Sequence, residues 1–378
     1  MGFLEKLLDG ADVEWMPLKS FASIGTGSSN RQDENVAGPY PFYVRSKSVL
    51  KSKTFQFNET AIVVPGEGGI GDIFHFVAGK YALHQRAYRI APDPDFVEPK
   101  FLFYWMSQSF KRYILRKSVG STTVSIRKPM LEEFEVPIPC PEDPEKSVAI
   151  QGEIVRILDS FTELTAELTA ELEARKKQYN HYRDELLTFK EGEAEWKALA
   201  DVAEIGTGTR NTQDATEDGE FVFYARGRDP LKLNAFDFDE TAIITAGDGA
   251  GVGKVFHYAE GKFALHQRAY RIVPTQVMNP RFVYHCIRSH FYDYIQRASV
   301  NSSVTSLRRP MFLKFPIPVP SLDEQARIAA ILDTFDTLTT SLSEGLPREI
   351  ELRQKQYEYY RDLLLNFPKP DEKSKAAA

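Results

Sequence analysis

The nonapeptide ALHQRAYRI occurs twice in the chain, at 82–90 and at 264–272, so a His-Gln-Arg tripeptide is repeated. Arginine binds phosphate oxygens through its charged guanidinium, and it also contacts the guanine edge in the major groove of DNA through two parallel hydrogen bonds. Because the two tripeptides are identical, phosphate contacts or a shared structural role explain them as well as base reading does. The candidate binding residues here are His84, Gln85 and Arg86, with His266, Gln267 and Arg268 in the second copy.

A second polar segment follows the tripeptide GTG, which stands at 25–27 and again at 206–208. Its residue types suit the reading of DNA bases, since Arg pairs with guanine and Asn or Gln with adenine. The copies differ here, SSNR against TRNT, as two surfaces that bind different sequences must. Divergent positions are therefore the better candidates for specificity. The candidates are Ser28, Asn30, Arg31 and Gln32, and in the second copy Thr209, Arg210, Asn211 and Gln213.

A third segment is rich in hydroxyl and basic side chains and precedes a proline in each copy. Such side chains bind phosphate and sugar oxygens. For all three segments, a solvated loop or a network that caps a turn is an equally good interpretation. The candidates are Ser121, Thr122, Thr123, Ser125, Arg127 and Lys128, with Asn301, Ser302, Ser303, Thr305, Arg308 and Arg309 in the second copy, and further Arg45, Lys47, Arg226 and Arg228.

Signs of catalysis or of a cofactor are weak. The glycines at 66–71 satisfy GxGxxG, but the next segment alternates like a strand, whereas the dinucleotide or S-adenosylmethionine fingerprint opens a helix. A tight turn, with backbone N–H groups that could face DNA phosphate, is the better interpretation. The chain contains neither an Asn-Pro-Pro-Tyr type tetrapeptide nor a GxxxxGK[ST] loop, so we expect catalytic residues to lie in other chains.

Metal binding is not indicated either. His75, His84 and their copies His257 and His266 have no cysteine or cluster of carboxylates to complete a ligand set, so we expect structural histidines. The two cysteines, Cys140 and Cys286, have no CxxC partner, which excludes a cysteine zinc site and a disulfide framework.

These segments belong to two copies of one long unit, offset by about 181 residues: ETAI at 59–62, for example, returns at 240–243. A unit this long exceeds solenoid and propeller periods, so each copy is expected to be a domain with a connector. The predicted parts are a junction segment at 1–14, globular domains at 15–141 and 195–320, helical regions at 142–194 and 321–367, and a tail at 368–378.

The two domains should be β-rich mixed domains of an α+β fold. Short runs of Phe, Tyr, Val and Ile between Gly and Pro predict strands and turns, and one helix follows a proline in each copy, at Pro99 and at Pro280. Each domain closes on a proline-bounded strand, FEVPIPCP or FPIPVP, which the prolines restrict to an edge or exit position.

After these prolines, apolar residues recur at steps of four and three, which predicts long helices, the first from about 147 to 188. This helix contains TAEL twice, at 165–168 and 169–172, and the second helix should break or kink near Gly345 and Pro347. Two similar apolar seams favour an antiparallel coiled-coil spacer with pseudo-two-fold symmetry. The opening LEKLLDGADVEW resembles ELLTFKEGEAEW at the first junction, so the two termini should lie close together.

The net charge of −6 hides an uneven distribution. Counted as Lys and Arg minus Asp and Glu, residues 15–140 carry +5 and residues 196–320 carry +2, and the excess acid lies in the helical regions. Basic domains suit a phosphate-facing surface, although +2 is a weak signal. The chain has no apolar run near the roughly 20 residues that span a bilayer and no signal peptide, so we expect no membrane partner and a cytoplasmic location.

Taken together, the tandem variable domains, the exit segment IPVPSLDEQARIAAILD, the repeated segments RKKQYNHYRDELL and RQKQYEYYRDLLL, and the TAEL copies resemble the specificity subunit of type I restriction-modification systems, and most closely the subgroup called type IC. The resemblance covers essentially the whole chain. It implies that each domain reads one half of a split double-stranded DNA target, and that the helical spacer binds two methyltransferase subunits. Restriction and motor subunits would complete the complex, and S-adenosylmethionine, ATP and Mg²⁺ would be bound by the partner subunits.

The helical regions carry aromatic and arginine residues of the kind that dominate interface energetics. We therefore expect partner contacts there, although a charged face on a self-packed coiled coil is the simpler alternative. Two other functions remain open for the chain: a self-contained DNA methyltransferase or nuclease, and a protein-only scaffold. The candidate partner-binding residues are Tyr179, Tyr182, Arg183, Tyr357, Tyr360 and Arg361.

Overall fold

The structure is a computed structural model that describes residues 3–117, 125–298, 309–341 and 343–369. The chain forms two compact units. The first unit contains the chain up to Glu167 and again from Glu351 on, and the second contains Leu168–Ile350. Each unit carries one strand-rich domain, named here the first domain (13–139) and the second domain (195–319). The predicted α+β class with two similar domains is confirmed.

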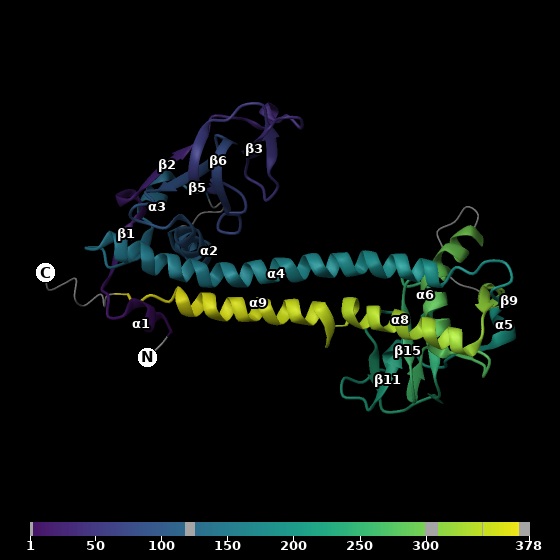
Figure 1. Cartoon of the computed structure of the whole chain (residues 1–378). Coiled ribbons are helices and arrows are strands. Elements are labelled where there is room, and N and C mark those ends of the chain that lie inside the picture. The colour runs from purple at the N-terminus through teal and green to yellow at the C-terminus, as the bar shows by residue number, and fades with distance from the viewer. Residues whose placement is uncertain (1–2, 118–124, 299–308, 342, 370–378) are drawn as a thin grey trace. The chain divides into compact units, whose positions relative to one another are not determined.

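The first domain is built on a six-stranded sheet in the order β2-β7-β5-β6-β3-β4 (Figure 1). Strands β5 and β6 are antiparallel, and β3 joins the edge of β6 in parallel. The sheet strands are β2 (Ala22–Thr26), β3 (Tyr40–Tyr43), β4 (Leu50–Ser52), β5 (Phe57–Pro65), β6 (His75–Leu83) and β7 (Ala87–Pro92), and the helical elements are η1 (Leu18–Ser20), η2 (Arg31–Asp33), α2 (Pro99–Lys117) and α3 (Lys128–Glu132).

The second domain repeats this order with one interruption. Its strands form two four-stranded sheets, β10-β17-β14-β15 and β12-β11-β16-β13, because the ladder that is continuous in β5 and β6 is divided near Gly261. The strands are β10 (Ala203–Thr207), β11 (Phe221–Tyr224), β12 (Leu231–Leu233), β13 (Phe238–Asp239), β14 (Ala242–Ala246), β15 (Phe256–Ala259), β16 (Lys262–Leu265) and β17 (Ala269–Pro274), and the helical elements are α5 (Leu199–Val202), η3 (Thr212–Asp214), α6 (Pro280–Ala298) and α7 (Arg309–Leu313).

Each domain is closed by a ribbon of its first and last strands. In the first domain β1 (Val13–Pro17) pairs with β8 (Glu135–Pro139), and in the second β9 (Glu195–Ala198) pairs with β18 (Pro316–Val319). The prolines of β8 and β18 have no N–H to offer a second neighbour, so a two-stranded ribbon suits them. The predicted proline-bounded exit strands are confirmed.

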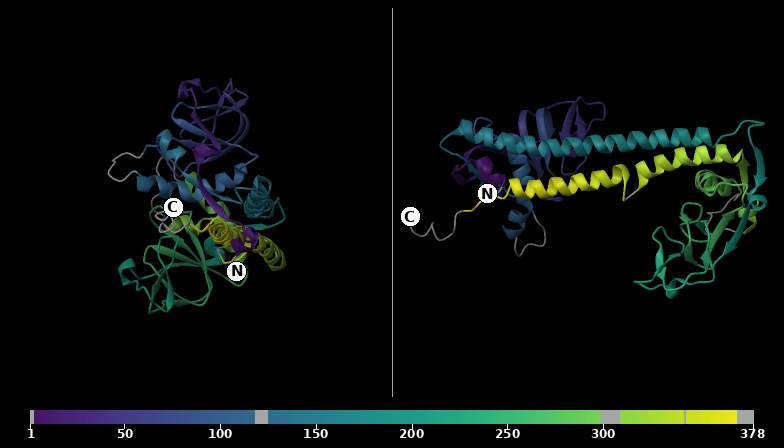
Figure 2. Two further views of the ribbon diagram at one scale, coloured as in Figure 1. Left: turned by 90° about the vertical axis from the view of Figure 1, so that its left-hand side faces the viewer. Right: turned by 60° about the horizontal axis from the view of Figure 1, so that its bottom comes forward.

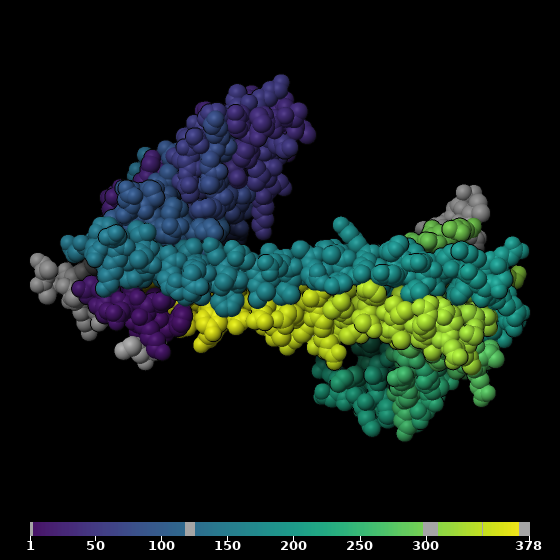
Figure 3. Space-filling model, viewed as in Figure 1, coloured from purple at the N-terminus to yellow at the C-terminus, as the bar shows by residue number. Residues whose placement is uncertain are grey.

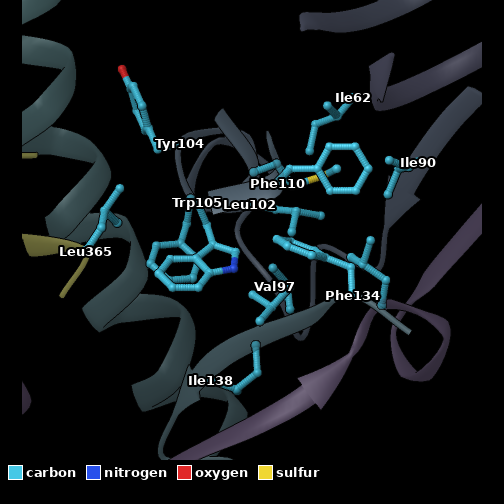
Figure 4. Close-up of a cluster of buried hydrophobic side chains, with 14 of the residues drawn as sticks. Ile62, Ile90, Val97, Leu102, Tyr104, Trp105, Phe110, Phe134, Ile138 and Leu365 are labelled. Atoms are coloured by element: carbon cyan, nitrogen blue, oxygen red, sulfur yellow. The ribbon is translucent and has the colours of Figure 1, made fainter. Parts of the chain in front are cut away.

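The core of the first unit forms around α2, which is buried on several sides. Figure 4 shows Trp105 and Phe110 of α2 together with Phe134 and with Leu365, a residue from the segment after the last helix. Phe110 meets Phe134 edge to face at 5.2 Å between ring centroids, and Trp105 meets Trp15 at 5.4 Å. Burying a large apolar side chain contributes about 1.5–3 kcal/mol, so this cluster joins the sheet, α2 and the helical region into one stable body.

The first helical region is one continuous helix, α4 (Pro144–Leu186), and the second is divided into α8 (Leu322–Thr340) and α9 (Gly345–Leu364), as Figure 1 shows. The predicted break near Gly345 is confirmed. Gly345 has φ +78°, and a Cβ atom at this position would collide with the carbonyl oxygens of Thr337 and Leu338, so only glycine fits here. Of the described helices, none is both long and apolar enough to cross a membrane.

The two helical regions pack against each other within each unit. In the first unit Phe161 of α4 stacks on Tyr360 of α9 at 5.1 Å, and in the second unit Tyr182 of α4 stacks on Phe335 of α8 at 5.7 Å. The first and last described segments of the chain meet in the first unit, as expected for nearby termini. Helix α1 (Phe3–Leu8) lies against α9 in both views of Figure 2 and in Figure 3, and Phe3 contacts Tyr360.

One aspartate in each unit ties the domain to its helical region. In the first unit, Asp159 of α4 accepts hydrogen bonds from Tyr104 Oη at 2.7 Å and Lys100 Nζ at 2.6 Å, both from α2. In the second unit, Asp333 of α8 holds His285 Nε2 at 2.7 Å and the guanidinium of Arg281, both from α6. The two anchors occupy equivalent places but use different donors.

The His285 anchor should make the second unit sensitive to acid. Burial lowers the pKa of His285 more strongly than Asp333 raises it, and its Nδ1 has no hydrogen-bond partner among the described residues. In the unfolded chain the imidazole of His285 takes up a proton near pH 6.5, whereas in the folded chain it stays neutral to lower pH. Folding stability is therefore lost as the pH falls below that value. We expect the free energy of unfolding to fall between pH 7 and pH 5, measured by denaturant titration.

The first unit supplies the matched variant for this test. His285→Tyr places the residue type of Tyr104 at the equivalent position, and a tyrosine does not titrate in this range. Other histidines remain in both proteins, so the quantity to compare is the difference between their pH profiles. If the wild type and the variant lose stability in parallel, His285 is not the sensitive group.

Candidate nucleic-acid interface

The polar loop after β2 begins with a close approach of two backbone segments. A Cβ atom on Gly27 would overlap the carbonyl oxygen of Leu83, and one on Gly208 would overlap that of Leu265. This is why glycine stands at the end of each GTG tripeptide. The approach brings the loop beside the His-Gln-Arg turn, and isolated bridges join Ser29 to His84 and Arg210 to His266.

The two predicted polar segments therefore form one surface in each domain. In the first domain the amide of Gln85 donates to Asn30 Oδ1, and the backbone N–H of Asn30 donates to Asp33 Oδ2 at 2.6 Å. In the second domain Gln267 and Asn211 make the same contact. These bonds hold the short helices η2 and η3, on which Arg31, Gln32 and Gln213 lie exposed.

Two arginines converge on one carboxylate in each domain. In the first domain, Arg86 Nη1 donates to Glu67 Oε1 at 2.7 Å, and Arg45 pairs with the same oxygen. The hydrogen bond from Arg86, with the charge of Arg45, holds the pKa of Glu67 below its usual range, so the carboxylate is ionised. Ser125 forms an isolated bridge with Glu67 and so also belongs to this surface.

The second domain has the same arrangement around Asp248. Arg226 Nη1 donates to Asp248 Oδ1 at 2.7 Å, and Arg268 Nη1 donates to Oδ2 at 3.0 Å. Burial alone would raise the pKa of Asp248, but the two arginine hydrogen bonds outweigh it and hold the pKa low. We call each pair of arginines with its carboxylate an arginine clamp: Arg45, Arg86 and Glu67 in the first domain, and Arg226, Arg268 and Asp248 in the second. Both clamps leave part of the guanidinium surface exposed, since the side chains of Arg86 and Arg268 are 58% and 61% accessible.

A cavity of about 420 Å³ opens at this surface of the second domain. Its lining is polar and carries two arginines, so it suits an anionic or hydrogen-bonding ligand rather than an apolar one. Its walls combine residues from the loop after the GTG turn, from the His-Gln-Arg turn and from the loop after β11, namely Asn211, Thr212, Gln213, Arg226, His266, Gln267 and Arg268.

The repeated histidines have structural roles. The Nδ1 atoms of His84 and His266 accept the backbone N–H of Arg86 at 3.0 Å and of Arg268 at 2.9 Å. Burial first, and then the neighbouring arginines, lower the pKa of both histidines, so both are neutral. Among the described residues, no three His, Cys, Asp or Glu side chains gather into a possible metal site.

The glycine cluster forms a turn between β5 and β6, and Gly68, Gly69 and Gly71 all have positive φ. No helix follows it, so the segment lacks the geometry that a dinucleotide fingerprint requires. The predicted tight turn is confirmed. The turn also places Glu67 where the two arginines of the first domain meet it.

The remaining predicted residues are spread more widely. Lys47 and Arg228 are exposed on the loops after β3 and β11, and Ser28 and Thr209 are exposed beside the GTG turns. Arg127 precedes α3, Lys128 pairs with Glu132 at 3.5 Å, and Arg309 donates to the carbonyl of Ile205 at 3.0 Å. Outside the described residues lie Ser121, Thr122, Thr123, Asn301, Ser302, Ser303, Thr305 and Arg308.

The aromatic residues predicted to contact partners make contacts within the chain. Tyr179 and Tyr182 pack against Phe335, and Tyr360 stacks on Phe161. Tyr357 packs at the core of the first unit. The arginines Arg183 and Arg361 each lie 5.8 Å above a tyrosine ring, of Tyr179 and Tyr357, and bond Asp184 and Asp362.

Besides the carboxylates Glu67 and Asp248, two residues of the polar surface were missed at the level of sequence. Gln56 contacts the hydroxyls of Ser28 and Ser29, and Asp237 pairs with Arg210. Neither residue belongs to a recognisable motif. The only signal was their equivalent position, since 56 and 237 differ by the same 181 residues that relate the GTG turns.

Comparison with known proteins agrees with this geometry. A family model described as the type I restriction modification DNA specificity domain matches residues 11–175 and again 192–352. The chain is 37% identical to the specificity subunit of the type I restriction enzyme EcoR124I/EcoR124II from Escherichia coli, over 98% of each protein. It is 31% identical to the EcoprrI specificity subunit from the same species, over 91% of this chain and 92% of that one.

Solved structures show the same fold. A crystal structure of a type I restriction-modification S subunit from M. genitalium aligns with a TM-score of 0.65 at 18% identity, over 96% of this chain and 98% of that one. The duplicated domain and the relatives that align along the whole chain agree with the resemblance seen in its motifs. The chain belongs to the family of type I restriction-modification specificity subunits.

Proposed function

We propose that this subunit reads a bipartite double-stranded DNA target, with one half-site for each domain, and performs no chemistry itself. The observation that carries the proposal is the doubled polar surface, in which two arginines, an Asn–Gln pair and exposed amides gather at equivalent positions of the two domains. Arginine forks suit phosphates and guanine, and amides suit adenine, so each surface combines positioning with base reading.

We also propose that the helical regions dock two methyltransferase subunits, through which restriction and motor subunits join. The name of the Escherichia coli relative, a restriction enzyme specificity subunit, supports work within a complex. On α9, Leu352 and Tyr359 lie seven residues apart and are 43% and 65% exposed, so they share one face and leave apolar surface uncovered in the isolated chain. In this proposal S-adenosylmethionine, ATP and Mg²⁺ are bound by the partner subunits.

The test is single-molecule methylome sequencing of cells that carry this chain with its methyltransferase. We expect one bipartite motif with a modified base in each half, and no such motif when the gene for this chain is deleted. Because the two domains are alike, the half-sites, read on opposite strands, should share some bases. Wholly unrelated halves would contradict the last expectation.

Two outcomes would replace the proposal. Binding of S-adenosylmethionine by the isolated chain would favour a self-contained DNA-modifying enzyme. Indifference to DNA sequence and to salt, with the methyltransferase present, would favour a protein-only scaffold, because phosphate contacts always make binding salt-dependent.

A further inference from the structure

The polar loops of the two domains make the same backbone hydrogen bonds but carry different side chains, among them Ser29 in the first domain and Arg210 in the second. The backbone N–H of Ser29 donates to Leu83 at 3.2 Å, and that of Arg210 donates to Leu265 at 3.2 Å. The carbonyl of each residue then accepts the N–H of the following turn, from Gln85 or Gln267, at 2.9 Å. The two residues are therefore structurally equivalent, and only their side chains differ.

A second pair of equivalent residues lies beside the first. The backbone N–H groups of Gln56 and Asp237 donate to Tyr81 and Phe263, each at 2.9 Å, so these two residues also occupy the same place in their domains. Each of their side chains reaches the differing residue of its own domain. The two domains thus differ by a pair of contacting residues rather than by two independent substitutions.

In the second domain the pair is an ion pair with a fixed anchor. Asp237 Oδ1 accepts from Arg210 Nε at 2.8 Å, and Asp237 Oδ2 accepts the backbone N–H of Leu265 at 3.0 Å. The Asp237 side chain is only 12% exposed. With both oxygens engaged, the carboxylate fixes the guanidinium by its Nε edge.

In the first domain the same space holds a neutral network. The amide of Gln56 lies 2.6 Å from Ser29 Oγ and 3.0 Å from Ser28 Oγ. An aspartate at 56 would leave a carboxylate among hydroxyls without a cation, and an arginine at 29 would lack its carboxylate. Because an unpaired, partly buried charge is costly, each member of the pair fits only its own partner.

The outer edge of the Arg210 guanidinium is available to a ligand. Its Nη1 and Nη2 atoms bond no other side chain or carbonyl in the part of the chain that the structure describes, and the side chain is 34% exposed. The next residue, Asn211, lines the cavity that also contains Arg226 and Arg268. Two parallel N–H donors on a fixed arginine match the O6 and N7 acceptors of guanine.

We propose that Arg210 reads a G·C pair in the half-site of the second domain and that Asp237 is its positioning residue. The first domain, with hydroxyls in place of the guanidinium, makes no demand for guanine at the equivalent base pair. The inference rests on the proposed function and deepens it, because it assigns one recognised base to one pair of residues.

The test exchanges the pairs between the domains in the full chain, expressed with its methyltransferase, and reads the motif by methylome sequencing. Arg210→Ser with Asp237→Gln is expected to remove the requirement for guanine at one base pair of the second half-site, a loss of about 5- to 150-fold in discrimination. Ser29→Arg with Gln56→Asp is expected to create that requirement in the first half-site. In each variant the other half-site serves as the internal control.

Asp237→Asn tests the positioning role separately. It keeps the size of the side chain but removes the charge that fixes Arg210, so discrimination should weaken at the same base pair and at no other. A role in folding alone would instead lower methylation of every sequence by the same factor, and that result would overturn the assignment of Asp237.

The outcomes separate the inference from the function beneath it. If the wild-type chain directs bipartite methylation and both exchange variants keep the original motif, the inference is wrong and the function stands. If the Arg210 variant loses affinity equally for all sequences, Arg210 contacts a phosphate and the inference is again wrong. If the wild-type chain directs no bipartite methylation, the proposed function fails, and this inference fails with it.

Discussion

A chain with a third TAEL copy inserted after Leu172 is expected to keep both half-sequences of its target and to lengthen the gap between them by about two base pairs. Both existing copies lie inside the continuous helix α4, so four more residues add about 6 Å to that helix, while one base pair occupies about 3.4 Å of DNA. Methylation at the original gap length should fall to background, as methylome sequencing of the inserted variant would show.

The control changes the same helix without changing its length. Thr165→Ala with Thr169→Ala keeps α4 at 43 residues and replaces threonine with a stronger helix former, so the original gap should be retained. An inserted variant that methylates the original motif, gap included, would show that α4 does not set the distance between the half-sites.

Removal of the arginine clamp of the second domain should weaken DNA binding strongly. A hydrogen bond to a charged group contributes roughly 1.5 kcal/mol or more, so Arg226→Ala with Arg268→Ala should cost about 100-fold in affinity. If both arginines contact phosphates, the slope of log affinity against log salt should become shallower by about 2. Fluorescence anisotropy on target duplexes, with the full chain and its methyltransferase across a salt series, measures both quantities.

Two further variants make this prediction specific. Arg156→Ala with Arg327→Ala removes the same charge from exposed positions on α4 and α8, where each arginine pairs with a glutamate of its own helix, and should leave affinity near the wild-type value. Arg45→Ala with Arg86→Ala should reproduce the loss in the first domain. Equal losses in the clamp and helix variants would mean that net charge alone attracts the DNA.

Much of the fold could be predicted because its signals are local. Apolar residues at steps of three and four define α4 and α8, and Gly345 breaks the second helical region because its backbone needs positive φ. The division of the second domain into two sheets was not predictable. Gly79 and Gly261 both have positive φ, yet only the first domain continues its ladder past this position, which depends on pairing with a distant strand.

The candidate site could be predicted only in part. The Arg, Asn and Gln candidates lie on one surface of each domain, because the GTG turn brings two segments about 55 residues apart into contact. Their anchors Glu67, Asp248, Gln56 and Asp237 were missed, since a carboxylate or amide in a turn has no signature until its partner is known. The partner contacts of the aromatic residues stay a prediction. Tyr357 and Tyr360 pack inside the first unit whereas Tyr359 is exposed, and the helix period cannot decide this without the neighbouring helix.

The contact between each domain and its helical region has an evolutionary consequence. Asp159 accepts a lysine and a tyrosine, whereas Asp333 at the equivalent place accepts an arginine and a histidine. The aspartate on the helical side thus accepts hydrogen bonds from either a lysine or an arginine, and from either a tyrosine or a histidine. We therefore expect that a domain from another relative, joined at its two-stranded ribbon, packs against the same helical region through this aspartate, and that exchange of whole domains changes the recognised sequence without changing the helices.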